Sequence, residues 1–237
     1  MGQSFFIWNG IDCRSRGIIM RGPAPIIRAE ERVKHVEIPG RAGDLTETEG
    51  EDIYNSYIQT IPISVRGGFR VREVYKWLRG SGFVTFSGEP DKKQKARVIG
   101  AVTLSKHSHN MDVWDGEVQF YCEPMKEKLE EAKVTISSSG AEVRNEGDVT
   151  ARPLWKVTAS DSTVVITAGG KTITSTEYSS GTVFYIDSDA GTVYNNNASE
   201  NWTKWSAGDF PVLDPGNNTV TGSGWSSIEI TKRERYL

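Results

Sequence analysis

The chain has 237 residues, of which 37% are hydrophobic and 25% are charged, and its formal net charge is -3. This composition is sufficient for a buried core and excludes a disordered chain. The mild acidity argues against nucleic acid as a partner, and no apolar run is long enough to cross a bilayer, so we expect neither nucleic-acid binding nor membrane insertion. Cys13 and Cys122 lie far apart in the sequence and predict free thiols in a protein made in a reducing cytoplasm.

The composition of the chain changes near residue 133. Of the 28 Lys and Arg residues, 20 precede residue 134, whereas the second half is rich in Ser, Thr, Gly and Asn. We therefore predict two domains, residues 1–133 and residues 134–237. The charged stretch 126–133 joins them, and its pattern fits either a short helical turn or an exposed linker.

The first half has the alternation of β-strands. Residues 60–65 alternate between polar and apolar side chains, which predicts a half-buried strand, and Pro62 places that strand at an edge because proline cannot donate to a ladder. In a second strand, Trp114, Val118, Phe120 and Cys122 share the apolar face, while Asp115, Glu117, Gln119 and Glu123 share the polar face. Two further strands are predicted at residues 83–86 and 96–104.

One helix is predicted, at residues 70–79. Its apolar stripe has helical spacing and consists of Val71, Val74, Tyr75 and Leu78. Gly80 is placed to end the helix in a left-handed conformation, and a helix this short must dock on a sheet to be stable. Trp77 lies off the stripe, where we expect it to cover a neighbouring loop or another subunit.

The second half predicts an antiparallel sandwich of short strands separated by turns. Segments 162–168 and 171–174 flank Gly169-Gly170, which suits a two-residue hairpin turn. Further strands are expected at residues 182–186, 192–194, 219–221 and 228–231. No long helix and no internal repeat is predicted there.

The segment 38–45 is the most elaborate loop of the sequence. It combines Pro39, Gly40 and Gly43 with the charged pair Arg41 and Asp44. Glycine permits backbone angles closed to other residues, and proline stiffens a turn, so the loop is expected to be ordered. An ordered loop that carries charge but no catalytic group indicates a surface that meets another protein.

Catalytic and metal-binding chemistry has little support in the sequence. His107 and His109, followed by Asp112, form the one cluster that resembles a metal site, but no further ligand completes it, so a polar hairpin tip is the better interpretation. No nucleophile elbow or phosphate-binding loop occurs, and Cys122 on an apolar strand face reads as a core thiol. We predict no catalytic residue, no metal and no cofactor.

The second half also contains four of the seven tryptophans. Trp202 and Trp205, beside several Asn residues, form a candidate glycan-stacking platform, and packing in the core or in loops is the alternative for them and for Trp155 and Trp225.

Several segments, taken in order, carry a resemblance to a known family. They are Phe6–Asp12, Arg28–Val33, Ile38–Leu45, Trp77-Leu78, Phe83–Phe86, Glu89–Asp91, Lys95–Ile99, Pro211–Leu213, Asn217–Thr219 and Gly222–Trp225. Together they resemble the distal tail protein family of long-tailed bacteriophages. The resemblance implies a mainly β fold, with an N-terminal tail-tube-like β domain that has one short α-helix and a C-terminal galectin-like antiparallel β-sandwich.

The resemblance also implies a function. Six copies of such a chain form a ring through their N-terminal domains, and the ring joins the tail tube protein to the tail-tip hub or tail-associated protein, with fibre or receptor-binding proteins as further partners. The sandwich faces outward, the location is the distal end of the virion tail, and synthesis takes place in the host cytoplasm. The expected ring or stacking contacts are Ile38, Pro39, Gly40, Arg41, Gly43, Asp44, Glu47 and Glu49. A carbohydrate-binding adhesion module is the alternative function, and a sandwich glycan hydrolase is a third.

Overall fold

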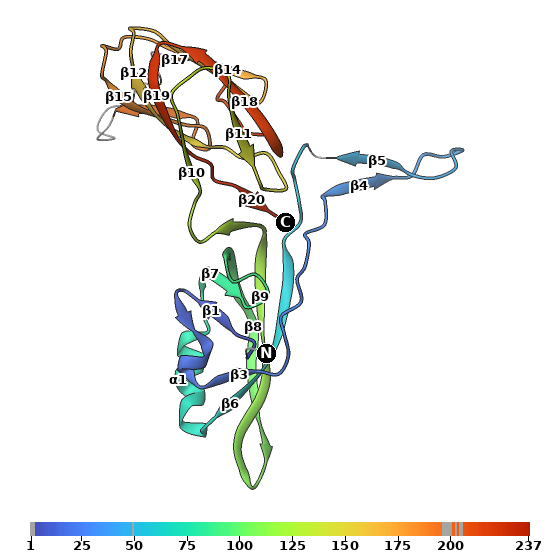
Figure 1. The fold of residues 1–237 in the computed structure, drawn as a ribbon. Helices are drawn as coiled ribbons and strands as arrows, with labels where there is room; N and C mark the ends of the chain where they lie inside the picture. The colour runs from blue at the N-terminus through green and yellow to red at the C-terminus, as the bar shows by residue number, and fades with distance from the viewer. Residues whose placement is uncertain (1–2, 49, 196–200, 202, 204–205) are drawn as a thin grey trace. The chain divides into compact units, whose positions relative to one another are not determined.

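The computed structural model describes residues 3–48, 50–195, 201, 203 and 206–237. The chain divides into two compact units, Met1–Leu129 with Leu237, and Glu130–Tyr236. Antiparallel sheets dominate both units, and one α-helix occurs in the described part of the chain (Figure 1). The mainly β fold predicted from the sequence is confirmed.

The first unit is built on a sheet with the strand order β2-β1-β7-β8-β9-β6-β3. Its strands are β1 (Phe6–Trp8), β2 (Ile11–Asp12), β3 (Ile18–Met20), β6 (Tyr57–Arg66), β7 (Ser81–Phe86), β8 (Lys92–Ser108) and β9 (Met111–Lys128). A separate two-stranded sheet pairs β4 (Val33–Val36) with β5 (Leu45–Thr48). Two short 3-10 turns, η1 (Cys13–Arg16) and η2 (Gly68–Arg70), precede β3 and the helix α1 (Val71–Trp77).

The helix α1 covers the core face of this sheet (Figure 1). Val71, Val74 and Leu78 are buried against the sheet residues Val118 and Phe120, as the predicted stripe requires. Two predictions about the helix were wrong. Tyr75 is 39% exposed, because the side-chain hydroxyl turns outward to accept a hydrogen bond from the backbone N–H of Leu104. Trp77 packs on the core of its own unit, where its ring stacks on Phe6 at a centroid distance of 5.8 Å.

The strand β6 corrects a second expectation. It was predicted as an edge strand because of Pro62, but it lies between β9 and β3. The strand β3 is short and pairs with residues 63–65 only, and the carbonyl of Pro62 accepts a hydrogen bond from the N–H of Arg21 just beyond the end of β3. Proline is tolerated here because β3 ends before any ladder donor is needed at this position.

The charged stretch that joins the two halves is neither a helical turn nor wholly a linker. Residues 126–128 continue β9, which is thus longer than predicted, and Lys133 begins β10. The strand persists because Lys92 and Lys93 of β8 pair with Lys128 and Glu127 in the ladder. Only residues 129–132 fall between strands.

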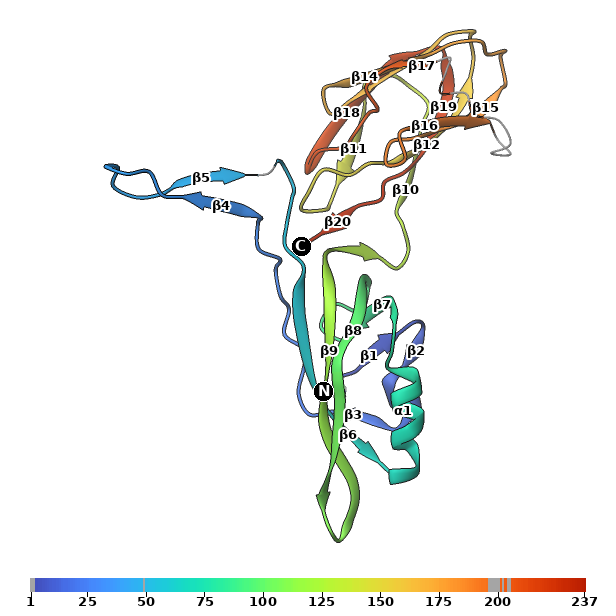
Figure 2. The same ribbon diagram turned by 180° about the vertical axis from the view of Figure 1, so that it is seen from behind.

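The second unit is a sandwich of two antiparallel sheets, ordered β10-β19-β12-β15-β16 and β11-β18-β13-β14-β17 among the described residues (Figure 2). Its strands are β10 (Lys133–Ile136), β11 (Ala141–Asn145), β12 (Leu154–Ala159), β13 (Val164–Ala168), β14 (Lys171–Ser175), β15 (Val183–Asp187), β16 (Thr192–Asn195), β17 (Ser206–Gly208), β18 (Gly216–Ser223), β19 (Trp225–Thr231) and β20 (Arg235–Tyr236). Inward residues of both sheets, including Trp155, Phe184 and Ile166, form one core. The β13–β14 turn has positive φ at Gly169 and Gly170, as the hairpin prediction requires.

An ion pair fastens the end of β15 in this sandwich. The guanidinium of Arg233 donates to both carboxylate oxygens of Asp187, at 2.6 and 3.0 Å. The same carboxylate accepts hydrogen bonds from the backbone N–H groups of Asp189 and Ala190, which orders the turn to β16. Burial acts to raise the pKa of Asp187, but the hydrogen bonds from Arg233 and the turn outweigh it and lower the pKa.

Candidate interaction surface

The predicted interface loop lies at the end of an exposed hairpin, which we call the arm (residues 30–55). At its base, the N–H of Arg32 bonds the carbonyl of Ile53, and the N–H of Asn55 bonds the carbonyl of Glu30. Beyond the base, β4 and β5 pair from Val33↔Thr48 to Val36↔Leu45. The arm stands apart from the main sheet of its unit in Figures 1 and 2.

The arm has almost no core of its own. Between residues 33 and 52, every described residue is exposed except Val33, Val36 and Leu45, which are half-buried. A lone two-stranded hairpin is marginally stable in water, and three or more strands or a packed face are normally needed. The arm is therefore expected to gain stability when another surface covers it.

The tip of the arm is a designed turn. The N–H of Arg41 bonds the carbonyl of Ile38 at 3.1 Å, with Pro39 and Gly40 as the two central residues. Gly40 has φ 83°, the left-handed conformation that a turn with proline first and glycine second requires. Gly43 has φ 80° and bends the chain a second time, into β5. Pro39 and the two glycines thus have the turn role that the sequence predicts.

The charged side chains of the tip all reach solvent. Arg41 and Asp44 line a shallow hollow together with Glu37, Ile38, Pro39 and Gly43. Glu47 lies one pair further along the hairpin, opposite Lys34 in the register. The structure brings the predicted contact residues together on one tip, except Glu49, which lies outside the described residues. Their role in contacts between copies stays a prediction.

The outer face of the main sheet is a surface that the sequence analysis missed. It is the face opposite α1, and three large apolar side chains lie open on it: Ile58 is 51% exposed, Tyr121 is 47% exposed and Phe83 is 37% exposed. Ile58 and Arg97 both pair with Tyr121 in the ladder, so these side chains form a row across β6, β9 and β8. A signal existed in the sequence, since Tyr121 interrupts the polar face that Glu117, Gln119 and Glu123 were predicted to share.

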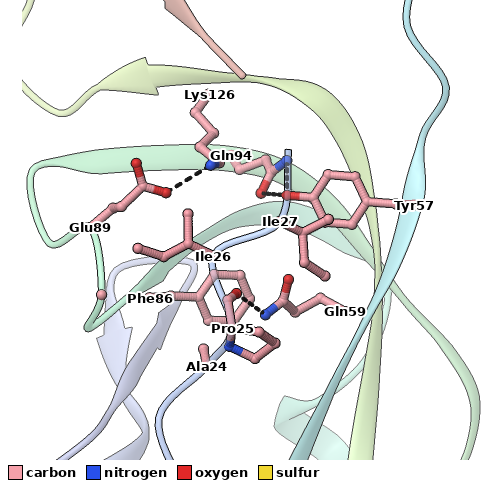
Figure 3. Close-up of a pocket in the computed structure, with 11 residues that line it drawn as sticks. Ala24, Pro25, Ile26, Ile27, Tyr57, Gln59, Phe86, Glu89, Gln94 and Lys126 are labelled. Atoms are coloured by element: carbon pink, nitrogen blue, oxygen red, sulfur yellow. Dashed lines mark hydrogen bonds and ion pairs between the residues drawn. The ribbon is translucent and has the colours of Figure 1, made fainter. Parts of the chain in front are cut away.

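A small pocket of the first unit is filled by its own polar network (Figure 3). The hydroxyl of Tyr57 bonds the side-chain amide of Gln94, and the amide of Gln59 donates to the carbonyl of Pro25 at 2.8 Å. Burial raises the pKa of Tyr57 to about 12. These contacts hold the segment 24–27 against the sheet, so the pocket serves packing rather than ligand binding.

An ion-pair network closes the same pocket. The ammonium groups of Lys126 and Lys92 each lie 2.7 Å from the carboxylate of Glu89. Burial acts to raise the pKa of Glu89, but the hydrogen bonds from these two lysines lower it overall. Because both positive charges are already satisfied by this carboxylate, the cluster offers no free site for an anion.

The histidine cluster is a hairpin tip, as the sequence analysis preferred. β8 ends at Ser108 and β9 begins at Met111. His107 contacts the carboxylate of Asp115 instead of pointing toward His109, and Asp112 accepts hydrogen bonds from the N–H groups of Gly68 and Trp114. Hydrogen bonds from Ser64 and His107 lower the pKa of Asp115. Within the described residues, no group of three His, Cys, Asp or Glu side chains is placed to hold a metal ion.

The tryptophan and cysteine predictions divide. Trp155 is fully buried in the sandwich core, and its indole N–H donates to the hydroxyl of Ser188 at 2.9 Å. Trp225 is buried in the same core. Trp202 and Trp205, the candidate glycan platform, lie outside the described residues. Cys13 and Cys122 are buried free thiols.

No helix in the described part of the chain is long and apolar enough to span a membrane. Comparison with curated proteins found no match.

Two solved structures resemble the chain. The Dit protein (gp 19.1) of phage SPP1, described as a paradigm of the hub adsorption apparatus in phages that infect Gram-positive bacteria, matches with a TM-score of 0.80 and 16% identity over 100% of both chains. The baseplate of phage p2, in its activated conformation with Sr, matches with a TM-score of 0.46 and 6% identity over 98% of both chains. The first match shows that the fold is shared along the whole chain.

A family model matches the second half of the chain. Residues 146–236 match the siphovirus-type tail component, C-terminal domain. The matched family is one of structural tail components and not of enzymes, which supports the prediction of a non-enzymatic protein. The chain thus carries a siphovirus-type tail component domain on a fold shared with a distal tail protein, and the resemblance to the distal tail protein family predicted from the sequence is confirmed.

Proposed function

We propose that this chain is a structural protein of the phage tail tip, and that its first half forms a ring of six copies. The ring joins the tail tube protein to the tail-tip hub protein, while residues 134–237 face outward toward fibre or receptor-binding proteins. The chain is made in the host cytoplasm and ends in the virion, at the distal end of the tail. The tail component domain and the shared fold support a place in the tail.

The arm is the observation that carries the ring. It exposes a two-stranded sheet on both faces, with a rigid charged tip, and a lone chain gains nothing from such a structure. Repeated contact between one copy and the next gives the arm a surface to cover it, and a head-to-tail contact of this kind closes into a ring when the rotation between copies allows. The tip residues from Ile38 to Glu47 are the proposed contacts.

Stoichiometry and position in intact tails test this function. Electron microscopy of purified virions that carry a tagged copy of the chain should locate about six copies in one layer at the tail tip. The purified chain, examined by mass photometry, should form species several times the 26.3 kDa monomer. A chain that is absent from every virion fraction contradicts the proposal.

Charge reversal at the tip tests the role of the arm. Arg41→Glu is expected to weaken assembly without changing the melting temperature, because the side chain is exposed in the single chain. Lys171→Glu, at an exposed position of the sandwich, is the matched control. Assembly that is equally strong in Arg41→Glu and in the control would remove Arg41 from the interface.

A further inference from the structure

The outer face of the main sheet combines apolar and basic side chains. Ile58, Phe83 and Tyr121 supply exposed apolar area on three different strands. Between them runs β8, on which Lys93, Lys95 and Arg97 alternate and therefore share one face. The ammonium of Lys93 lies 5.0 Å from the ring centroid of Phe83, which shows that the basic and aromatic groups belong to the same surface.

Two of these basic groups are available to a partner. Lys93 lies 3.8 Å from Glu127, whereas Lys95 and Arg97 form no ion pair with any residue that the structure describes. Both side chains are exposed. An open face with apolar anchors and available cations has the composition of an interface core with a charged rim.

The arm has the complementary chemistry. Asp44, Glu47 and Glu51 are exposed along its second strand and the residues on either side, and within the described chain neither Asp44 nor Glu47 forms an ion pair. The register places Val36, Leu45 and Glu47 on the same face of the hairpin, so that face is both apolar and acidic.

We propose that the arm of one copy docks on the outer sheet face of the next copy, with the face that bears Val36, Leu45 and Glu47 toward Tyr121 and Arg97. This inference rests on the proposed ring and names the surface that the arm contacts within it. Opposite charges select the partner and fix the register, and the apolar groups supply the buried area. One contact then covers both surfaces that a lone chain leaves open, the arm and the outer sheet face.

Disulfide trapping in the full chain tests the contact. The native cysteines do not interfere because Cys13 and Cys122 are both 0% exposed. We would mix two single variants, Glu47→Cys and Arg97→Cys, at high concentration under mild oxidation. The expected product is a covalent heterodimer on a non-reducing gel, formed at least ~10-fold more than in a mixture of Glu47→Cys with Lys171→Cys, whose second cysteine lies in the sandwich.

A double variant separates docking on the next copy from docking on the same chain. A chain that carries both Glu47→Cys and Arg97→Cys should give a ladder of covalent oligomers. An internally crosslinked monomer, without heterodimers in the mixture, shows that the arm folds onto its own sheet and overturns the inference. The absence of any crosslink overturns it too.

The wild-type chain keeps this failure distinct from failure of the proposed function. If wild-type rings are present in virions but no crosslink forms between copies, the docking surface is wrong and the ring stands. If the chain is absent from virions, the proposed function fails first. Charge exchange gives an independent readout: Arg97→Glu should weaken assembly ~10-fold, and adding Glu47→Lys should restore it. Equal weakening in both variants also overturns the inference.

Discussion

The ion pair between Asp187 and Arg233 gives a quantitative prediction for the sandwich. Replacing Arg233 with Gln leaves the carboxylate of Asp187 only 13% exposed and without its bidentate partner. Breaking a fully buried pair costs about 3–5 kcal/mol, and because the side chain of Arg233 is 21% exposed we expect Arg233→Gln to cost about 2–3 kcal/mol at pH 7.

The cost should depend on pH. The pKa of Asp187 is lower in the folded chain than in the unfolded chain, so its contribution to stability is complete above about pH 4 and is lost as the pH falls through the folded value. Arg233→Gln removes the largest cause of that lowering. The difference in the free energy of unfolding between wild type and Arg233→Gln should therefore shrink between pH 7 and pH 3.

Hydrogen exchange measured by mass spectrometry is the assay, because it reports on each unit separately. Peptides that cover β12 and β15 should exchange faster in Arg233→Gln, while peptides from β6 and β9 should not change. Arg144→Gln, at an exposed position of β11, is the matched control and should alter stability by less than about 0.5 kcal/mol. The reasoning is refuted if Arg233→Gln behaves like this control, or if its cost is the same at pH 3 and pH 7.

Three further predictions concern local packing. Phe184→Ala removes a fully buried ring and should cost about 3–5 kcal/mol by urea unfolding; a cost below about 1 kcal/mol would mean that the site is not packed. Gly224→Ala should destabilise far more than Gly170→Ala, since a Cβ at Gly224 would lie 1.8 Å from the carbonyl oxygen of Thr163 whereas Gly170 faces open space; equal melting temperatures would contradict this. Burial raises the pKa of Cys122 to about 12, so iodoacetamide at pH 8 should label this thiol only after unfolding, and rapid labelling of the folded chain would show that the strand opens.

Local pattern was sufficient wherever neighbouring residues determine the structure. The alternation of Val118, Phe120 and Cys122 predicted the buried face of β9, because side chains in a strand point alternately to the two faces. The Gly169-Gly170 pair predicted the β13–β14 hairpin, because its turn needs two residues at positive φ.

The errors arose where distant segments decide the outcome. Pro62 lies inside the sheet because β3, some forty residues earlier in the chain, ends just before it. Trp77 finds Phe6 of β1, and no pattern around residue 77 contains that contact. The tip of the arm was found from its turn residues, but the outer sheet face was not, because its row of side chains is assembled from strands that are far apart in the sequence.

The arm also bears on how single chains avoid sticking to each other before assembly. A hairpin without neighbours offers two unpaired edges, which invite strand addition and the growth of fibres. Lys34 and Glu47 place charge on both strands, and Pro39 together with the bends at Gly40 and Gly43 prevents either strand from running on through the tip. The same charges that favour one specific neighbour thus keep the free chains from joining in long, irregular stacks.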